Sequence, residues 1–175
     1  MLIAHIPAGY ITAKAFKQEK RSVIASSMFF SVWPDLGLIY FYFFDNSNTF
    51  HRHHFPHLPI VMAITFLITL PLYRAKFFEK ARIYYVLFFL NWLIHFVLDT
   101  FTERIFWLYP FSNAGFRLIE IPANFSHWMI SFVLHWSFAV EAAIVTVAVV
   151  LFVKARKQRQ KKGICPHSHS SMRMQ

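Results

Sequence analysis

Four long apolar runs constrain the fold of this chain more than any other feature of its sequence. They cover residues 23–44, 58–73, 83–101 and 127–153. A helix needs about 20 residues to cross the hydrocarbon core of a bilayer, and each run is close to that length. Apolar residues make up 57% of the chain, more than a soluble globule of this size normally contains. We therefore predict an all-α fold, a multi-pass transmembrane helical bundle with four long spans.

A shorter apolar stretch at residues 1–16 precedes these runs and contains Pro7, which favours a helix that starts near it. We expect a short apolar helix there, either partly inserted or crossing the membrane. Residues 1–153 are then one membrane-embedded helical domain. Residues 154–175 are polar and basic, and we expect them to form a disordered cytoplasmic tail.

Basic residues give the chain a formal net charge of +10, and they fall into three groups at residues 14–21, 74–82 and 154–162. Nucleic acid is one possible partner for such a charge, but membrane topology explains the grouping more simply. If all three groups lie in the cytoplasm, the alternate connections lie outside. We therefore expect a multi-pass membrane protein with its basic groups in the cytoplasm, surrounded by lipid, with no nucleic-acid partner and an undefined oligomeric state.

The connection at residues 51–57 is dense in histidine, with His51, His53, His54 and His57 around Arg52. Imidazole is the commonest metal ligand in proteins, and carboxylates precede this stretch in the chain. One interpretation is that the stretch forms part of a metal site. The other is that it is a solvated polar loop between two spans.

Ionisable residues inside the apolar runs favour the first interpretation. His95 and Asp99 are four residues apart, which places both side chains on one face of the predicted helix. Asp35 follows Pro34, where a broken helix needs a polar or water-filled surrounding. Each intramembrane charge costs at least about 2.5 kcal/mol on insertion scales. A shared metal would offset that cost, although pairwise contacts that only fix helix packing remain the alternative.

Four ionisable side chains also have similar predicted depths: His5, Asp35, His95 and Glu141. Counted at about 1.5 Å per residue from the nearest basic group, each lies roughly 18–21 Å from the inner boundary. Asp99 and the histidine-rich connection lie further out. The count predicts that these groups meet in a pocket that opens toward the outer side.

The order of these residues resembles a family of bacterial inner-membrane metal-dependent hydrolases that includes LexA-regulated members. The similar elements are His5 with Gly9, Pro34-Asp35, His51-Arg52 with His57, His95 with Asp99, and the sequence WLYPF at residues 107–111. The family is distantly similar to zinc-dependent phospholipase C. The resemblance, which covers about residues 1–112, implies a multi-pass helical hydrolase of the bacterial inner membrane with six candidate metal ligands: His5, Asp35, His51, His57, His95 and Asp99.

These observations lead us to expect an enzyme, a metal-dependent hydrolase that cleaves a phosphoester of a lipid at the outer face of the membrane. A divalent metal, zinc or a related ion, would activate water, and six candidate ligands leave room for two ions. Arg52 could bind a phosphate oxygen, and His54 or Glu141 could move the proton. The alternatives are a metal-ion transporter or metal-binding membrane protein, and a structural protein whose polar residues only fix helix packing.

Overall fold

A computed structural model describes residues 1, 3–37, 55–122 and 127–164 of the chain. Within these ranges every regular element is helical, as the apolar runs predicted. The α-helices are α1 (His5–Ala15), α2 (Arg21–Phe30), α4 (Pro59–Arg74), α5 (Arg82–Thr100), α6 (Trp128–Val133) and α7 (Phe138–Ile164). Short 3-10 helices are η1 (Trp33–Asp35), η3 (Phe55–His57) and η4 (Lys76–Ala81).

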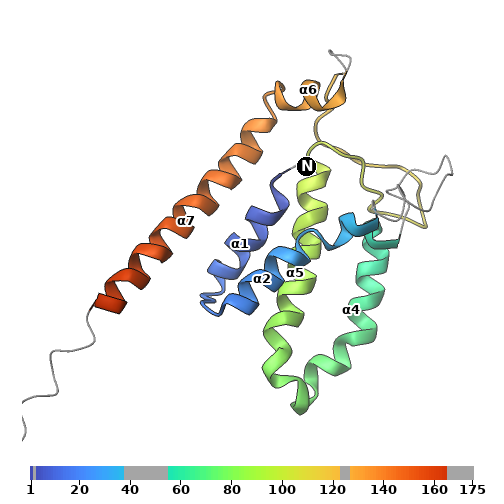
Figure 1. The fold of residues 1–175 in the computed structure, drawn as a ribbon. Coiled ribbons are helices and arrows are strands. Elements are labelled where there is room, and N and C mark those ends of the chain that lie inside the picture. Colours follow the sequence, from blue (N-terminus) through green and yellow to red (C-terminus); the bar gives the residue numbers. More distant parts are fainter. Residues whose placement is uncertain (2, 38–54, 123–126, 165–175) are drawn as a thin grey trace, which may run out of the picture.

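Helix α5 is the centre of the fold and packs against α1, α2 and α4 (Figure 1). Its buried residues recur at helical spacing: Leu87, Asn91, Trp92, His95, Phe96, Asp99 and Thr100. This stripe is polar as well as apolar, because three successive turns contribute Asn91, His95 and Asp99. The buried face of α5 therefore brings polar side chains into the interior of the bundle.

Helix α7 packs on α1 at the edge of the bundle (Figure 1). Few of the side chains along its apolar stretch are buried. Val149 and Phe152 are each more than half exposed. A helix this apolar would be buried in a soluble protein, since water disfavours such a surface. Its exposure fits a surrounding of lipid.

Among the described helical segments, two are long and apolar enough to cross a membrane: Lys76–Thr100 and Phe138–Lys161. The expectation of four long spans is therefore not met. Helix α4 has 16 residues. At about 1.5 Å per residue it is roughly 24 Å long, less than a hydrocarbon core of about 30 Å.

Two of the expected spans are interrupted. In the run at 23–44, α2 ends at Phe30 and is followed by η1, since Pro34 has no backbone N–H for a continuing helix. Residues 38–44 lie outside the described part. In the run at 127–153, α6 ends at Val133 and α7 begins at Phe138. Between them, His135 Nδ1 accepts the backbone N–H of Ser137 at 3.3 Å.

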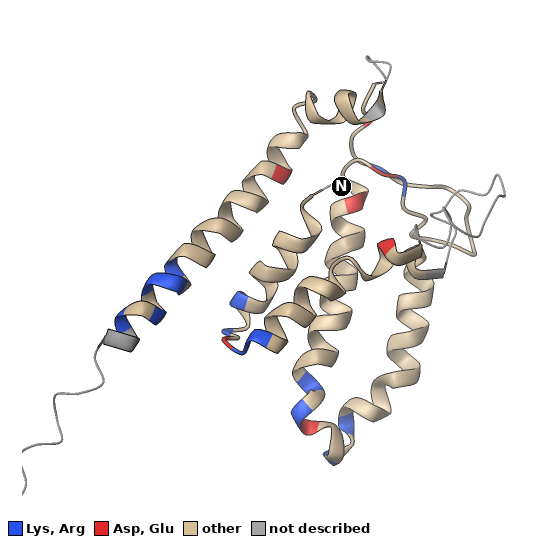
Figure 2. Ribbon diagram, in the orientation of Figure 1, with Lys and Arg blue, Asp and Glu red and all other residues tan. Residues whose placement is uncertain are grey.

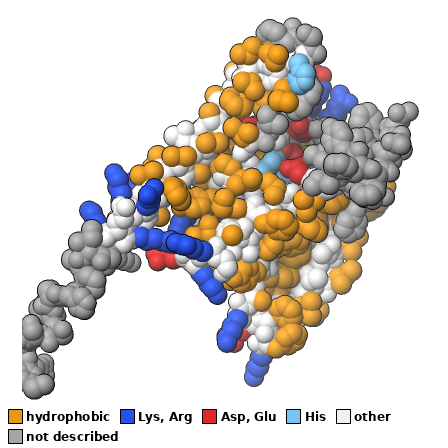
Figure 3. All heavy atoms as spheres, viewed as in Figure 1, with side chains coloured by type: hydrophobic (Ala, Val, Ile, Leu, Met, Phe, Trp, Pro, Cys, Tyr) orange, Lys and Arg blue, Asp and Glu red, His pale blue; other side chains and the backbone are white. Residues whose placement is uncertain are grey.

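The basic tail also differs from its prediction. Helix α7 continues through residue 164, so the first half of the tail is helical rather than disordered, while residues 165–175 lie outside the described part. Lys and Arg gather at one end of the bundle, where α1 joins α2, α4 joins α5, and α7 ends (Figure 2). On the face in Figure 3, hydrophobic side chains cover most of the surface between the two ends.

Candidate metal centre

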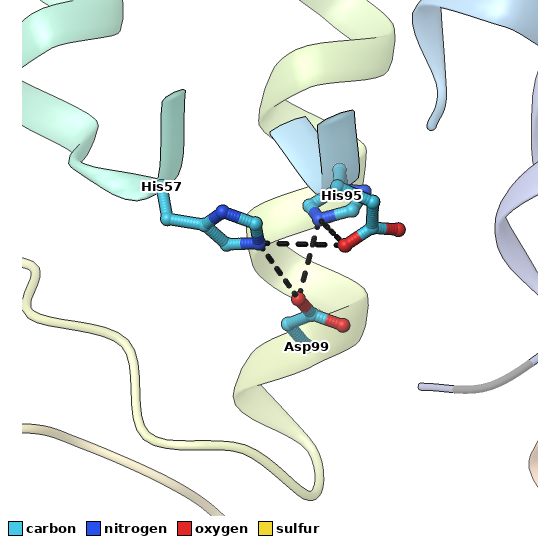
Figure 4. Close-up of side chains that lie close together, drawn as sticks. His57, His95 and Asp99 are labelled. Atoms are coloured by element: carbon cyan, nitrogen blue, oxygen red, sulfur yellow. Dashed lines mark ion pairs between the residues drawn. The ribbon is translucent and has the colours of Figure 1, made fainter. Parts of the chain in front are cut away.

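Four side chains from three segments meet near the end of the bundle opposite the basic groups: Asp35, His57, His95 and Asp99. One ligand atom from each lies within 4.8 Å of the others, and we call this group the four-residue centre. Figure 4 shows His57 reaching from η3 toward His95 and Asp99, which both project from α5. Such a group of two imidazoles and two carboxylates could hold a divalent metal ion.

Local structure explains how each residue reaches the centre. His95 and Asp99 are four apart on α5, so they share one helix face. Pro34 at the second position of η1 helps to end α2, and Asp35 follows directly. The indole N–H of Trp92 donates to the Pro56 carbonyl at 2.8 Å and holds η3, with His57, against α5.

The orientation of His95 is set by a backbone carbonyl. Its Nδ1 lies 2.8 Å from the oxygen of Ser31, and because a carbonyl only accepts, Nδ1 must carry the proton. In the neutral ring, Nε2 then has a free lone pair. This Nε2 atom is buried and has no hydrogen-bond partner among the described residues. It faces Asp99 Oδ2 at 3.2 Å and Asp35 Oδ1 at 3.6 Å.

A lone pair that faces two carboxylate oxygens is repelled unless a cation, either a proton on Nε2 or a metal ion, lies between them. The spacing suits a metal. Zinc bonds of about 2.0–2.1 Å in a tetrahedral site place neighbouring ligand atoms roughly 3.4 Å apart. The centre has His57–Asp35 and His57–Asp99 separations of 3.5 and 4.0 Å besides the two His95 distances.

Three of the four residues in the centre are buried, and the fourth is partly exposed. The side chains of His57, His95 and Asp99 are at most 7% exposed, whereas that of Asp35 is 32% exposed. Buried charges are costly without compensation, which strengthens the case for a bound cation. The open side at Asp35 is where water or a substrate group can enter.

His5 lies beside the four-residue centre rather than within it. Its Nε2 is 3.1 Å from Asp99 Oδ1, and its ring stacks on His95 with centroids 4.0 Å apart. The Met1 amino group also contacts Asp99 Oδ1, at 2.6 Å. Asp99 Oδ2 thus faces His57 and His95 in the centre, whereas Asp99 Oδ1 contacts His5 and the Met1 amino group.

Glu141 on α7 is fully buried, and its Oε2 accepts the backbone N–H of Ile3 at 2.7 Å. Because Ile3 comes two residues before His5, this contact ties α7 to the segment that carries His5. The three remaining predicted residues, His51, Arg52 and His54, lie outside the described residues.

Sequence reasoning missed the groups that support the ligands. Ser31 acts through its backbone oxygen and Pro56 through its carbonyl, and neither contact depends on a side chain that a sequence pattern would reveal. Trp92 had one usable signal, because it lies three residues before His95 and so falls near the same face of the helix.

Comparisons with protein families, with characterised proteins and with solved structures gave no match for this chain.

Proposed function

We propose that this protein is a membrane-bound metal-dependent hydrolase that cleaves a phosphoester of a lipid at the outer face of the bacterial inner membrane. The metal would be zinc or a related divalent ion held by Asp35, His57, His95 and Asp99. Two observations support this proposal: the metal-binding side chains of the centre, and the resemblance of residues 1–112 to the hydrolase family.

The observation that carries the metal assignment is the environment of His95 Nε2. Its proton lies on the opposite ring nitrogen, and its lone pair faces two carboxylates in a buried space. A ligating histidine is usually held in this way, with the other ring nitrogen donating to a carbonyl or carboxylate. The Ser31 contact supplies that support.

The position of the centre supports an outer location. Basic residues concentrate at the opposite end of the helices (Figure 2), and such residues favour the cytoplasmic side of a bacterial membrane. Asp99 lies at the far end of α5 from Arg82, near the last turn of this candidate span. A lipid headgroup at the outer surface would therefore be near the open side of the centre.

Bound at this centre, zinc would lower the pKa of a water ligand toward neutrality and so supply a nucleophile for hydrolysis. The protein residues have separate tasks. His57, His95 and Asp99 would form the enclosed wall, and the partly exposed Asp35 would border the side from which water and substrate enter. The two carboxylates balance the charge of a divalent ion in this buried space.

The proposal is tested by measuring the metal content and lipid hydrolysis of the purified full chain in detergent. We expect about one divalent ion per wild-type chain and release of a phosphorylated headgroup from mixed phospholipids. His57→Ala removes one ligand, and Asp99→Asn replaces an anionic carboxylate with a neutral amide. Each change should lower metal occupancy by about tenfold or more. Both variants should lose hydrolysis.

His135→Ala is the matched control, because His135 is half-buried and bonds Ser137 away from the centre. It should retain metal and activity. Wild-type protein with no bound metal would contradict the metal assignment. Stoichiometric metal without any hydrolysis would instead favour metal binding or transport.

A further inference from the structure

A cleft of about 590 Å³ lies beside the final turn of α5, apart from the four-residue centre. Val97 and Phe101 form one side, and Trp107, Leu108, Phe116 and Leu118 come from the loop that follows. Its volume is within the range of small-molecule binding sites, about 300–1,000 Å³. Val97 is two residues from both His95 and Asp99, so the cleft and the centre lie on opposite faces of α5.

Backbone hydrogen bonds hold the loop in place around the cleft. Ile105 and Phe116 exchange two of them, at 3.0 and 2.9 Å. The N–H of Leu118 then donates to the Thr100 carbonyl at 2.8 Å, which returns the loop to the end of α5. Backbone hydrogen bonds therefore hold the loop that lines the cleft, and no ligand is needed to order it.

The polar atoms nearest the cleft already bond to each other. Trp107 Nε1 donates to Thr100 Oγ1 at 3.0 Å, and that hydroxyl donates to the Phe96 carbonyl at 2.7 Å. The remaining side chains along the wall are hydrocarbon or aromatic. An occupant is therefore held by apolar contact and shape rather than by hydrogen bonds.

The cleft is continuous with the exposed apolar face of a candidate membrane span. Leu93 and Val97 lie one turn apart on this face of α5 and are 39% and 47% exposed. Leu108 at the cleft is 65% exposed. Arg104 is exposed, and its Cβ lies next to Gly115, which lines the cleft. An exposed cation attached at this point could pair with the phosphate of a lipid headgroup.

We propose that this cleft binds an acyl chain of a membrane phospholipid. A long, flexible hydrocarbon chain fits a narrow apolar site that opens toward lipid, and its headgroup would remain near Arg104 at the membrane surface. The bound lipid lies next to the centre with α5 between them. This inference does not depend on hydrolysis by the protein.

The test uses bromine on the acyl chains of a phosphatidylglycerol, because bromine quenches the fluorescence of a tryptophan that it contacts. The full chain in a bromine-free detergent is titrated with this lipid. We expect saturable quenching, with a component that Trp107→Phe removes. Unbrominated long-chain phosphatidylglycerol should compete for the site, whereas inorganic phosphate should not.

Val97→Phe fills the cleft and should weaken the saturable component by about tenfold or more, corresponding to about 1.4 kcal/mol. Leu93→Phe is the matched control, because it makes the same kind of change on the same helix face one turn away from the cleft wall. It should leave the quenching unchanged. Both positions are exposed, so neither change disturbs the core.

Three results would overturn the proposal. Quenching that rises without saturation would mean that tryptophans contact lipid only through general partitioning. Equal quenching in wild type and Trp107→Phe would place the lipid elsewhere, even if Val97→Phe failed to fold. A dimer that Val97→Phe dissociates, with no saturable quenching in wild type, would assign the cleft to a second copy of the chain.

Discussion

At the scale of single residues, Ser27 connects three helices beneath the four-residue centre. Its hydroxyl donates to the Gly9 carbonyl at 2.7 Å and accepts from Asn91 Nδ2 at 2.9 Å. Both Ser27 and Asn91 are completely buried. Without this hydroxyl, the Gly9 carbonyl would lose a hydrogen-bond donor and the Asn91 side-chain amide would lose an acceptor.

We expect Ser27→Ala to lower the free energy of unfolding by about 1–2 kcal/mol, because unsatisfied buried polar groups cost more than exposed ones. The measurement is the midpoint of thermal unfolding in detergent. Ser22→Ala is the control, since Ser22 is in the same helix and shares only an exposed contact with Tyr84. Equal effects of the two changes would contradict a structural role for the buried network.

At the scale of secondary-structure elements, the approach of α1 to α2 determines whether the centre can form. A Cβ added at Gly9 would lie 2.6 Å from the Ser27 carbonyl oxygen and 2.8 Å from Met28 Cα. These are backbone atoms, so the two helices would have to separate. Ser31, whose carbonyl orients His95, is at the end of α2 and would move with it.

Gly9→Ala should therefore destabilise the protein by about 1–3 kcal/mol, even though alanine has the higher helix propensity. It should also reduce metal occupancy, because the His95 support shifts. Ile6→Ala in the same helix is the control: Ile6 is exposed, and the change should alter stability by less than about 0.5 kcal/mol. A Gly9→Ala protein as stable and as metal-loaded as wild type would show that the close approach is not required.

At the scale of the whole molecule, charge and chemistry are separated along the helices. Basic residues mark one end of the bundle (Figure 2). The four-residue centre and the apolar cleft both include residues from the opposite end of α5. This arrangement places the basic end in the cytoplasm if the protein follows the positive-inside rule. The site and the cleft would then share the outer side.

Cysteine labelling in intact cells tests this orientation, because Cys165 is the only cysteine of the chain. A membrane-impermeant maleimide should label Cys165 only after the membrane is opened. In a Cys165→Ser background, Asn113→Cys should react from outside, since Asn113 is exposed in the loop next to the cleft. The reverse pattern would place the centre in the cytoplasm.

The sequence by itself determined the helical class, the apolar character and the pairing of His95 with Asp99. These features depend on local periodicity and composition, which act over a few residues. It also indicated Asp35 and His57 as candidate ligands. It overstated the number of long spans, because apolar length alone does not reveal where a helix stops, as between α6 and α7.

Only the tertiary structure decided which candidates converge. It brought Asp35, His57, His95 and Asp99 together. It also placed His5 next to Asp99 Oδ1, outside this group, and gave Glu141 a hydrogen bond with the backbone N–H of Ile3. The physical reason is that a metal centre requires ligand atoms within a few ångströms, and that precision comes from packing and backbone contacts. The carbonyls of Ser31 and Pro56 fix the centre, yet every residue carries a carbonyl, so no sequence pattern could identify them.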